Sequence, residues 1–243
     1  MILEAHIGIG LYGNEGMRAV QSSDFALGEF RFLWRLVLVH GRWNYLRNAE
    51  MILYFFYKNA VFTFPQFMFA FICGFSAQTI FDDYYITFYN MVFTALPLMV
   101  KAVFEQDINY KPNLDHFRYF FPALYYVGQR SLIFSATNYL KWIVEAALHS
   151  VVVFIVAYWS HRDAILHEDG RNNDLWSFSV TVFTAVILIV TLKLVLFTRL
   201  LNWVSALSFT LLSLAPYFGY VWVTNYLEFS NTHLSIEVTF SSS

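Results

Sequence analysis

The composition of the chain points to a membrane protein. The sequence has 243 residues and a formal net charge of −2; 58% of the residues are hydrophobic, 21% are aromatic and only 13% are charged. Because a typical soluble domain carries about 25% charged residues, these values exclude a disordered chain and disfavour an ordinary soluble domain. The near-neutral charge gives no reason to expect nucleic acid as a partner. A single cysteine, Cys73, excludes an internal disulfide.

The first 46 residues have a different pattern from the rest of the chain. Short apolar runs alternate with glycine turns, with HIGIG at 6–10, GNEG at 13–16 and SDFA at 23–26. These runs predict strands at 6–10 and 23–26, a turn at 13–16 and one helical turn at 17–21. The glycine spacing fits neither a dinucleotide nor a P-loop fingerprint. The pattern is typical of the end of an α/β domain, too short to bury a core of its own.

Five apolar stretches follow, each long enough to cross a bilayer as a helix. They are Met51–Ser76, Tyr84–Val103, Tyr139–Trp159, Trp176–Leu196 and Trp203–Thr224. Long unbroken apolar runs disfavour a β-barrel, which needs alternating strands. The sequence therefore predicts an all-α polytopic membrane helical bundle of about five transmembrane helices. A sixth run, Tyr119–Val127, is short and broken by proline, and we expect it to lie at the membrane surface.

The distribution of Lys and Arg predicts the orientation of these helices. Most basic residues lie before the first span, between the second and third, and between the fourth and fifth, whereas the opposite loops hold only Arg162 and Arg171. The basic side is therefore expected to face the cytoplasm. The resulting division is a cytoplasmic segment at 1–46, a transmembrane domain at 47–225 and an exoplasmic tail at 226–243.

The first predicted span contains a lysine. Lys58 and Asn59 lie about two turns into it, where a charge is costly unless it faces the bundle interior or a wet cavity. A snorkelling lysine near the interface would explain Lys58 alone. It would not explain Thr63 and Gln66, which continue the polar character at helical spacing, or Pro65, which frees a backbone carbonyl. These residues favour a polar substrate pathway.

The second span contributes Asn90 and Thr94, which are four residues apart and share a helix face. Such residues often hydrogen-bond a neighbouring helix. Together with Lys58 and Asn59 on the adjacent helix, they favour a shared polar groove that binds substrate.

Two further groups are interpreted as structural. Glu145 and His149 are spaced i, i+4 in the third span and predict a hydrogen-bonded pair rather than a proton relay or a metal site. The loop 160–175 is rich in His, Asp and Glu, but its spacing fits a solvated turn better than a metal site. We predict no metal site and no catalytic residue in this chain.

Several runs, taken in order, are similar to one family. They are HIGIG, GNEGMRAV and SDFA near the start, LVHGRW at 38–43, FYKN at 56–59, GFSAQ at 74–78, YNMVFTALP at 89–97, WSF at 176–178 and VTLK at 190–193. This series resembles P-type ATPases and, more narrowly, their phospholipid-flippase (type IV) branch. The resemblance implies that residues 1–46 end the phosphorylation domain and that the five spans are the family's fifth to ninth membrane helices. It also implies a C-terminal fragment that lacks the phosphorylated aspartate and the nucleotide domain.

The function implied by the resemblance is ATP-driven movement of phospholipids, aminophospholipids being the expected class, from the outer to the cytoplasmic leaflet. The full-length parent would use ATP and Mg²⁺, whose binding motifs this fragment lacks, so the fragment alone would not be competent. An accessory subunit of the CDC fifty type is implied as a partner. The location implied is the plasma membrane or an endosomal or Golgi membrane.

The resemblance also assigns site residues. Lys58 and Asn59 match a pair associated with lipid handling, and Asn90 matches a polar position on the neighbouring helix. Cys73 stands where many phosphatidylserine flippases have Asn. The run FICGFS at 71–76, with Glu105 and Asn109 later, resembles a plasma-membrane and endosomal subgroup that moves phosphatidylserine and phosphatidylethanolamine.

Two alternatives stay open. An ion-pumping P-type ATPase would need acidic residues at the depth of Asn90, and the second span has none between Asp83 and Glu105. A non-catalytic five-span fragment, acting as an interaction module, belongs to another class of protein. The genomic sequence upstream of Met1 would discriminate this module from the enzyme.

Overall fold

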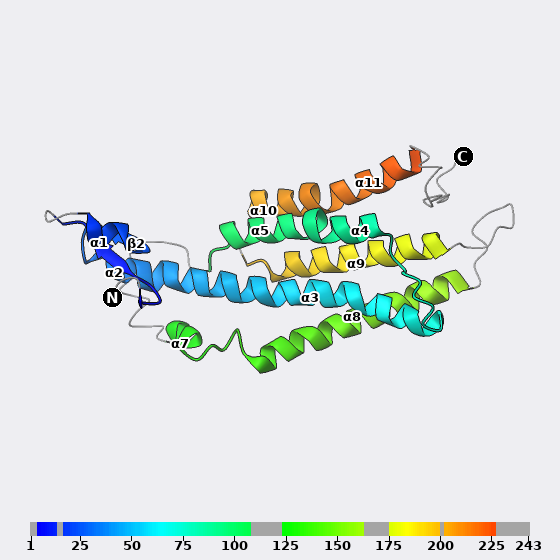
Figure 1. The fold of residues 1–243 in the computed structure, drawn as a ribbon, viewed down its shortest axis with the longest axis horizontal. Coiled ribbons are helices and arrows are strands. Elements are labelled where there is room, and N and C mark those ends of the chain that lie inside the picture. Colours follow the sequence, from blue (N-terminus) through cyan, green and yellow to red (C-terminus); the bar gives the residue numbers. More distant parts are fainter. Residues whose placement is uncertain (1–3, 14–16, 108–122, 163–174, 200–201, 227–243) are drawn as a thin grey trace. The chain divides into compact units, whose positions relative to one another are not determined.

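The computed structural model describes residues 4–13, 17–107, 123–162, 175–199 and 202–226 (Figure 1). The chain divides into two compact units, one of Met1–Arg47 with Asp107–Ile133 and one of Asn48–Gln106 with Phe134–Ser243. Several expectations lie outside the described residues. They concern most of the turn at 13–16, the first part of the run at 119–127, most of the loop at 160–175 and nearly all of the tail at 226–243.

A two-stranded parallel sheet opens the first unit. β1 (Ile9–Leu11) pairs with β2 (Phe25–Leu27), and α1 (Arg18–Gln21) lies between them in the chain. Parallel strands require a crossover connection, so this β–α–β order is typical of an α/β domain. The expected α/β remnant is confirmed, although the strands begin two or three residues later than the sequence pattern predicts.

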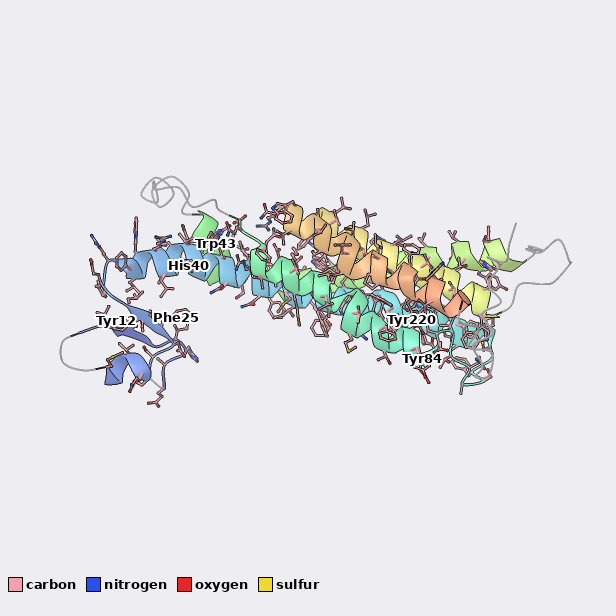
Figure 2. All side chains as sticks on the ribbon, turned by 90° about the horizontal axis from the view of Figure 1, so that it is seen from above. Tyr12, Phe25, His40, Trp43, Tyr84 and Tyr220 are labelled. Atoms are coloured by element: carbon pink, nitrogen blue, oxygen red, sulfur yellow. The ribbon has the colours of Figure 1, made fainter. Side chains whose placement is uncertain are left out.

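The first unit continues as helix. α2 (Phe32–Arg35) runs through a π-helical turn, η2 (Leu36–Gly41), into α3 (Arg42–Ile72), and α7 (Ala123–Gln129) is a separate short helix. His40 and Trp43 lie next to each other on this stretch, with their rings edge to face at 5.3 Å (Figure 2).

The second unit is a bundle of long helices that run alongside one another (Figure 1). Besides most of α3, it contains α4 (Asp83–Phe88), η3 (Tyr89–Phe93), α5 (Ala95–Phe104), α8 (Ala136–Arg162), α9 (Leu175–Phe197), α10 (Trp203–Ser208), η4 (Phe209–Leu214) and α11 (Ala215–Tyr226). Elements α4, η3 and α5 follow one another as a single helix broken at Thr94, whereas α10, η4 and α11 form one continuous helix with a π-helical turn. The all-α bundle predicted from the sequence is confirmed.

Four stretches of the described chain are long and apolar enough to cross a membrane. They are Asp83–Phe104, Ala136–His161, Leu175–Phe197 and Trp203–Val223. Each matches a predicted span to within three residues at either end. The agreement follows from the length of the apolar runs, since a helix of about 20 such residues is needed to span the hydrocarbon core.

The first predicted span corresponds to α3, which differs from the other four. It is not one of the apolar stretches named above, and it carries Lys58, Asn59 and Gln66 within the predicted range. It ends at Ile72 rather than at residue 76, because Gly74 adopts a left-handed φ of 59° and the amide of Phe75 bonds the carbonyl of Ala70. This is the usual glycine stop of a helix.

α9 is the central helix of the bundle. Its residues contact four neighbours: Val190 with Tyr54 of α3, Lys193 with Glu145 of α8, Thr191 with Ser213 of η4, and Thr184 with Tyr217 of α11. Each contact joins a polar group of α9 to a polar group of another helix. Such contacts stabilise helix packing in a membrane, where the hydrophobic effect does not drive helices together.

Exposed aromatic side chains gather at the ends of the apolar helices. Trp159 near the end of α8, Trp203 at the start of α10 and Trp222 near the end of α11 are all exposed. Tyr84 and Tyr220 lie toward one and the same end of the bundle (Figure 2). Amphipathic aromatic side chains favour the two membrane–water interfaces, so this arrangement fits helices that span a bilayer.

α3 passes through Pro65 without ending. Since proline has no amide hydrogen, the carbonyl of Val61 loses its normal helical partner. The hydroxyl of Ser150 in α8 lies 3.0 Å from this carbonyl oxygen and 2.8 Å from that of Ala146 in its own helix. A neighbouring helix therefore satisfies the carbonyl that Pro65 frees.

The substitution Ser150→Ala tests this contact. It should lower the free energy of unfolding by about 1 kcal/mol, because the freed Val61 carbonyl then lacks a donor in an apolar environment. The measurement is unfolding of the purified protein in micelles titrated with SDS. Ser208→Ala is the control, since that buried hydroxyl bonds only within its own helix. An equal loss in both variants would contradict the interhelix role.

Candidate functional site

Lys58 is buried at the contact between α3 and the broken helix of residues 83–104. Its side chain is only 1% exposed. The ammonium donates to Thr94 Oγ1 at 2.7 Å and lies 3.4 Å from Asn90 Oδ1. The rings of Phe55 and Tyr89 face it, with centroids 5.2 and 5.8 Å from Nζ. The structure thus brings together three of the five predicted site residues, Lys58, Asn90 and Thr94.

The partner helix is broken where it meets Lys58. η3 makes a wider π-helical turn, and Thr94, which follows it, has φ −120° and ψ −27° rather than helical angles. Pro97 explains the distortion, because its ring clashes with the carbonyl four residues before it and it has no amide hydrogen to donate. The Thr94 hydroxyl donates to the carbonyl of Tyr89 at 2.7 Å. The Thr94 side chain therefore supplies a hydrogen bond to a backbone carbonyl next to the break in the helix.

Tyr89 closes a loop of hydrogen bonds around this contact. Its hydroxyl donates to the carbonyl oxygen of Lys58 at 2.8 Å. Its own carbonyl accepts from Thr94, which in turn accepts from the Lys58 ammonium. The side chains of Lys58, Tyr89 and Thr94 thus connect α3 to the partner helix in a ring of hydrogen bonds. Nothing in the sequence pattern singled out Tyr89, because a tyrosine within an apolar span looks like a core residue.

Asn59 and Cys73 are not part of this cluster. The structure gives Asn59 no hydrogen bond to Lys58, Asn90 or Thr94, all of which it describes; the carbonyl of Asn59 accepts from Thr63 at 2.8 Å. Cys73 lies just past the end of α3, fifteen residues after Lys58, or about 22 Å along a helix. Cys73 therefore lies apart from the Lys58 cluster, and its role in substrate binding stays a prediction.

Cys73 instead lines a separate open hollow of about 330 Å³. Thr63, Gln66 and Gln78 contribute polar groups to the lining, and Phe67 and Phe75 contribute apolar ones. The amide oxygen of Gln66 already accepts from the backbone of Ile80 at 3.2 Å.

Glu145 and His149 do not form the predicted pair. Glu145 makes an ion pair with Lys193 of α9, while His149 Nδ1 lies 2.6 Å from the hydroxyl of Tyr57 of α3. Each side chain contacts a different neighbouring helix instead of the other residue on α8. The interhelix partners compete successfully with the i, i+4 contact, which is worth only a few tenths of a kcal/mol.

A buried ionic cluster was missed by the sequence reasoning. Glu50 Oε2 lies 3.3 Å from Lys101 Nζ, and Glu50 Oε1 accepts from Arg199 Nη2 at 2.8 Å. Glu105 Oε1 accepts from the backbone amide of Arg199 at 2.7 Å. Lys101 and Glu105, spaced i, i+4 at the end of an apolar span, were a local signal for it, but Glu50 and Arg199 are far apart in sequence.

The substitution Thr94→Val tests the bond between Thr94 and Lys58. It preserves the shape of the side chain but removes the acceptor, so the free energy of unfolding should fall by about 1–3 kcal/mol because a buried ammonium loses a partner. Thr94→Ser should keep most of the stability. Thr87→Val is the control, as that exposed hydroxyl bonds only its own helix. Equal losses in Thr94→Val and Thr94→Ser, measured by SDS titration, would assign the effect to packing.

Comparison with known proteins places this chain in a family. The family model described as phospholipid-translocating P-type ATPase C-terminal matches residues 20–242. Human phospholipid-transporting ATPase ID is 41% identical over 220 residues, which cover 90% of this chain and 18% of the relative. Human phospholipid-transporting ATPase IC is 39% identical over 219 residues, covering 90% and 17%. Human phospholipid-transporting ATPase IG is 39% identical over 205 residues, covering 84% and 18%.

These matches agree with the resemblance seen in the sequence. The chain spans less than a fifth of the length of these relatives. The family match nevertheless covers nearly the whole chain, including every helix that carries the Lys58 cluster. The chain therefore belongs to the family of C-terminal regions of phospholipid-translocating P-type ATPases.

Proposed function

We propose that this chain provides C-terminal membrane helices of an ATP-driven translocase that moves phospholipids from the outer to the cytoplasmic leaflet. The observation that carries the proposal is the buried ammonium of Lys58. Its hydrogen-bond partners, within the part of the chain that is described, are the neutral oxygens of Thr94 and Asn90. The positive charge at this position is therefore available to an anionic group.

A phospholipid phosphate has the chemistry that suits this position. An ammonium removed from water is stabilised by an opposite charge and by hydrogen bonds. Asn90 is exposed beside Lys58 and offers an amide to the same head group. A transported cation would instead need several anionic or carbonyl oxygens, and Lys58 would repel it. The charge of this site thus favours a lipid head group over an ion.

Only the head group needs to enter a polar site. The acyl chains can stay in the bilayer, since many apolar side chains on the outside of the bundle are exposed, among them Met91 on η3 and Met99 on α5. Asn59, next to Lys58, remains in the proposal as an additional contact. Cys73 is proposed as a contact at the far end of α3, where a lipid would arrive first if that end is exoplasmic.

The finer features of the translocase rest on the family resemblance. We propose aminophospholipids as the substrate class, a plasma-membrane, endosomal or Golgi location, and an accessory subunit of the CDC fifty type. ATP and Mg²⁺ would act in parts of the protein outside this chain. Among the described residues, no group of three or more His, Cys, Asp or Glu could hold a metal ion.

The test is Lys58→Ala in the full-length protein. The variant should lose about tenfold or more in kcat/KM for the lipid in lipid-stimulated ATP hydrolysis, because a charge contact to the head group is removed. Phosphatidylserine, phosphatidylethanolamine and phosphatidylcholine in detergent micelles are the probes. Lys141→Ala is the control, as Lys141 is exposed on α8.

Two outcomes would contradict the proposal. Unchanged lipid stimulation in Lys58→Ala would remove Lys58 from the substrate site. A full-length protein that hydrolyses no ATP with any of the three lipids would overturn the translocase and favour the non-catalytic interaction module.

A further inference from the structure

A second buried polar contact joins the two helices that form the Lys58 site. Glu50 of α3 and Lys101 of α5 pair at 3.3 Å, and their side chains are 4% and 6% exposed. The other carboxylate oxygen of Glu50 accepts from Arg199, just after α9. Lys101 also lies over the ring of Phe197, 4.5 Å from its centroid. The pair is thus buried, and each member has a further contact, unlike an ion pair on a surface.

The two contacts belong to one register between antiparallel helices. Along α3, Glu50 precedes Lys58 by eight residues, or about 12 Å. Along the partner helix, Lys101 follows Thr94 by seven residues, or about 10 Å. The separations match, so the Glu50–Lys101 and Lys58–Thr94 contacts are successive steps of the same pairing.

A third step continues the pairing on the other side of Lys58. Phe62 lies four residues after Lys58, and Tyr89 lies five residues before Thr94; their rings stack at 4.5 Å. The helices are therefore aligned over about three turns, with an ion pair at one end, an aromatic stack at the other and Lys58 between them.

Of these three contacts, the ion pair discriminates best between registers. Aromatic and aliphatic side chains tolerate a slide of one helix past another, because the hydrophobic effect is non-directional. A slide of one turn would leave the Lys101 ammonium buried without its carboxylate partner, which is strongly unfavourable, while Glu50 would keep Arg199. Buried polar residues set helix register in the same way in coiled coils.

The break in the partner helix makes such a contact necessary. η3 and Thr94 interrupt the regular backbone hydrogen bonds next to Lys58, so the backbone alone does not hold Thr94 in place. Lys101 lies on the intact segment, α5, that follows the break. Anchoring α5 to Glu50 fixes that segment from its far end and thereby places Thr94 against the Lys58 ammonium.

We propose that Glu50 and Lys101 are positioning residues of the lipid site, which set the register of α3 against α5 and act through Lys58. The inference rests on the proposed function, since it assigns Lys58 to the lipid head group. Misplacing a binding group by about 1 Å can reduce a rate a hundredfold, so loss of the register should weaken lipid recognition without direct contact to lipid.

The test compares two variants of the full-length protein. Glu50→Gln leaves Lys101 without its charge partner, and it should lower the thermal midpoint and raise the lipid KM. The double variant Glu50→Leu with Lys101→Met replaces the pair by apolar groups, which is often neutral or stabilising. Arg199 also loses Glu50, but its side chain is 45% exposed. The double variant should recover the thermal midpoint yet keep a lipid KM raised about tenfold or more, with phosphorylation from ATP in the absence of lipid unchanged.

Two controls accompany these variants. Glu29→Gln removes a carboxylate from an exposed ion pair with Arg31 and should change neither quantity. Lys58→Ala is measured with the same lipids, phosphatidylserine, phosphatidylethanolamine and phosphatidylcholine in micelles. If the double variant recovers both the thermal midpoint and the lipid KM, the pair is only structural and the inference is overturned.

The Lys58→Ala result separates this inference from the proposed function. An effect of Lys58→Ala without an effect of the double variant overturns the positioning role alone. If Lys58→Ala has no effect, the proposed lipid site fails, and the positioning role fails with it.

Discussion

The burial of the Lys58 ammonium is the constraint on which the rest of the second unit depends. A charge inside an apolar bundle is tolerated only where polar groups replace water, and those groups must come from another helix. Thr94 and Asn90 supply oxygens, and the rings of Phe55 and Tyr89 add their electron-rich faces. The position of η3 against α3 is therefore set by a polar requirement and not by apolar packing alone.

Two proline residues leave backbone carbonyl groups near this charge without their usual helical hydrogen-bond partners. Pro65 follows Lys58 by two turns, and Pro97 follows Thr94 by one. The two helices compensate differently: α3 stays regular and its freed carbonyl accepts from Ser150, whereas residues 83–104 open into a π-helical turn. Backbone irregularity at membrane depth is tolerated where protein or a wet cavity covers it. The irregular helix is the one that carries Asn90, the exposed polar residue of the cluster.

The parts of the fold that the sequence could predict are those with a local signal. Four spans agree to within three residues, because apolar length is a property of one segment. The meeting of Lys58 with Thr94 was predictable because polar residues in apolar spans need partners. The prediction of a Glu145–His149 pair was wrong, because other helices supply better partners for both side chains. The contact of Glu50 with Arg199 joins residues 149 positions apart, a separation that no periodicity encodes.

The charged side chains of the bundle also differ in how they are compensated, and this difference supports the proposed site. Glu50 is paired with Lys101 and Arg199, and Lys193 is paired with Glu145. In such closed pairs each charge already faces an opposite charge, so an added ion would leave one charge uncompensated. Among the described residues, Lys58 is hydrogen-bonded to neutral oxygens and makes no ion pair with a carboxylate. In the proposed function, a lipid phosphate would complete an ion pair with Lys58. On this proposal, the closed Glu50–Lys101 pair would hold the two helices in register, while Lys58 would bind and release the lipid phosphate.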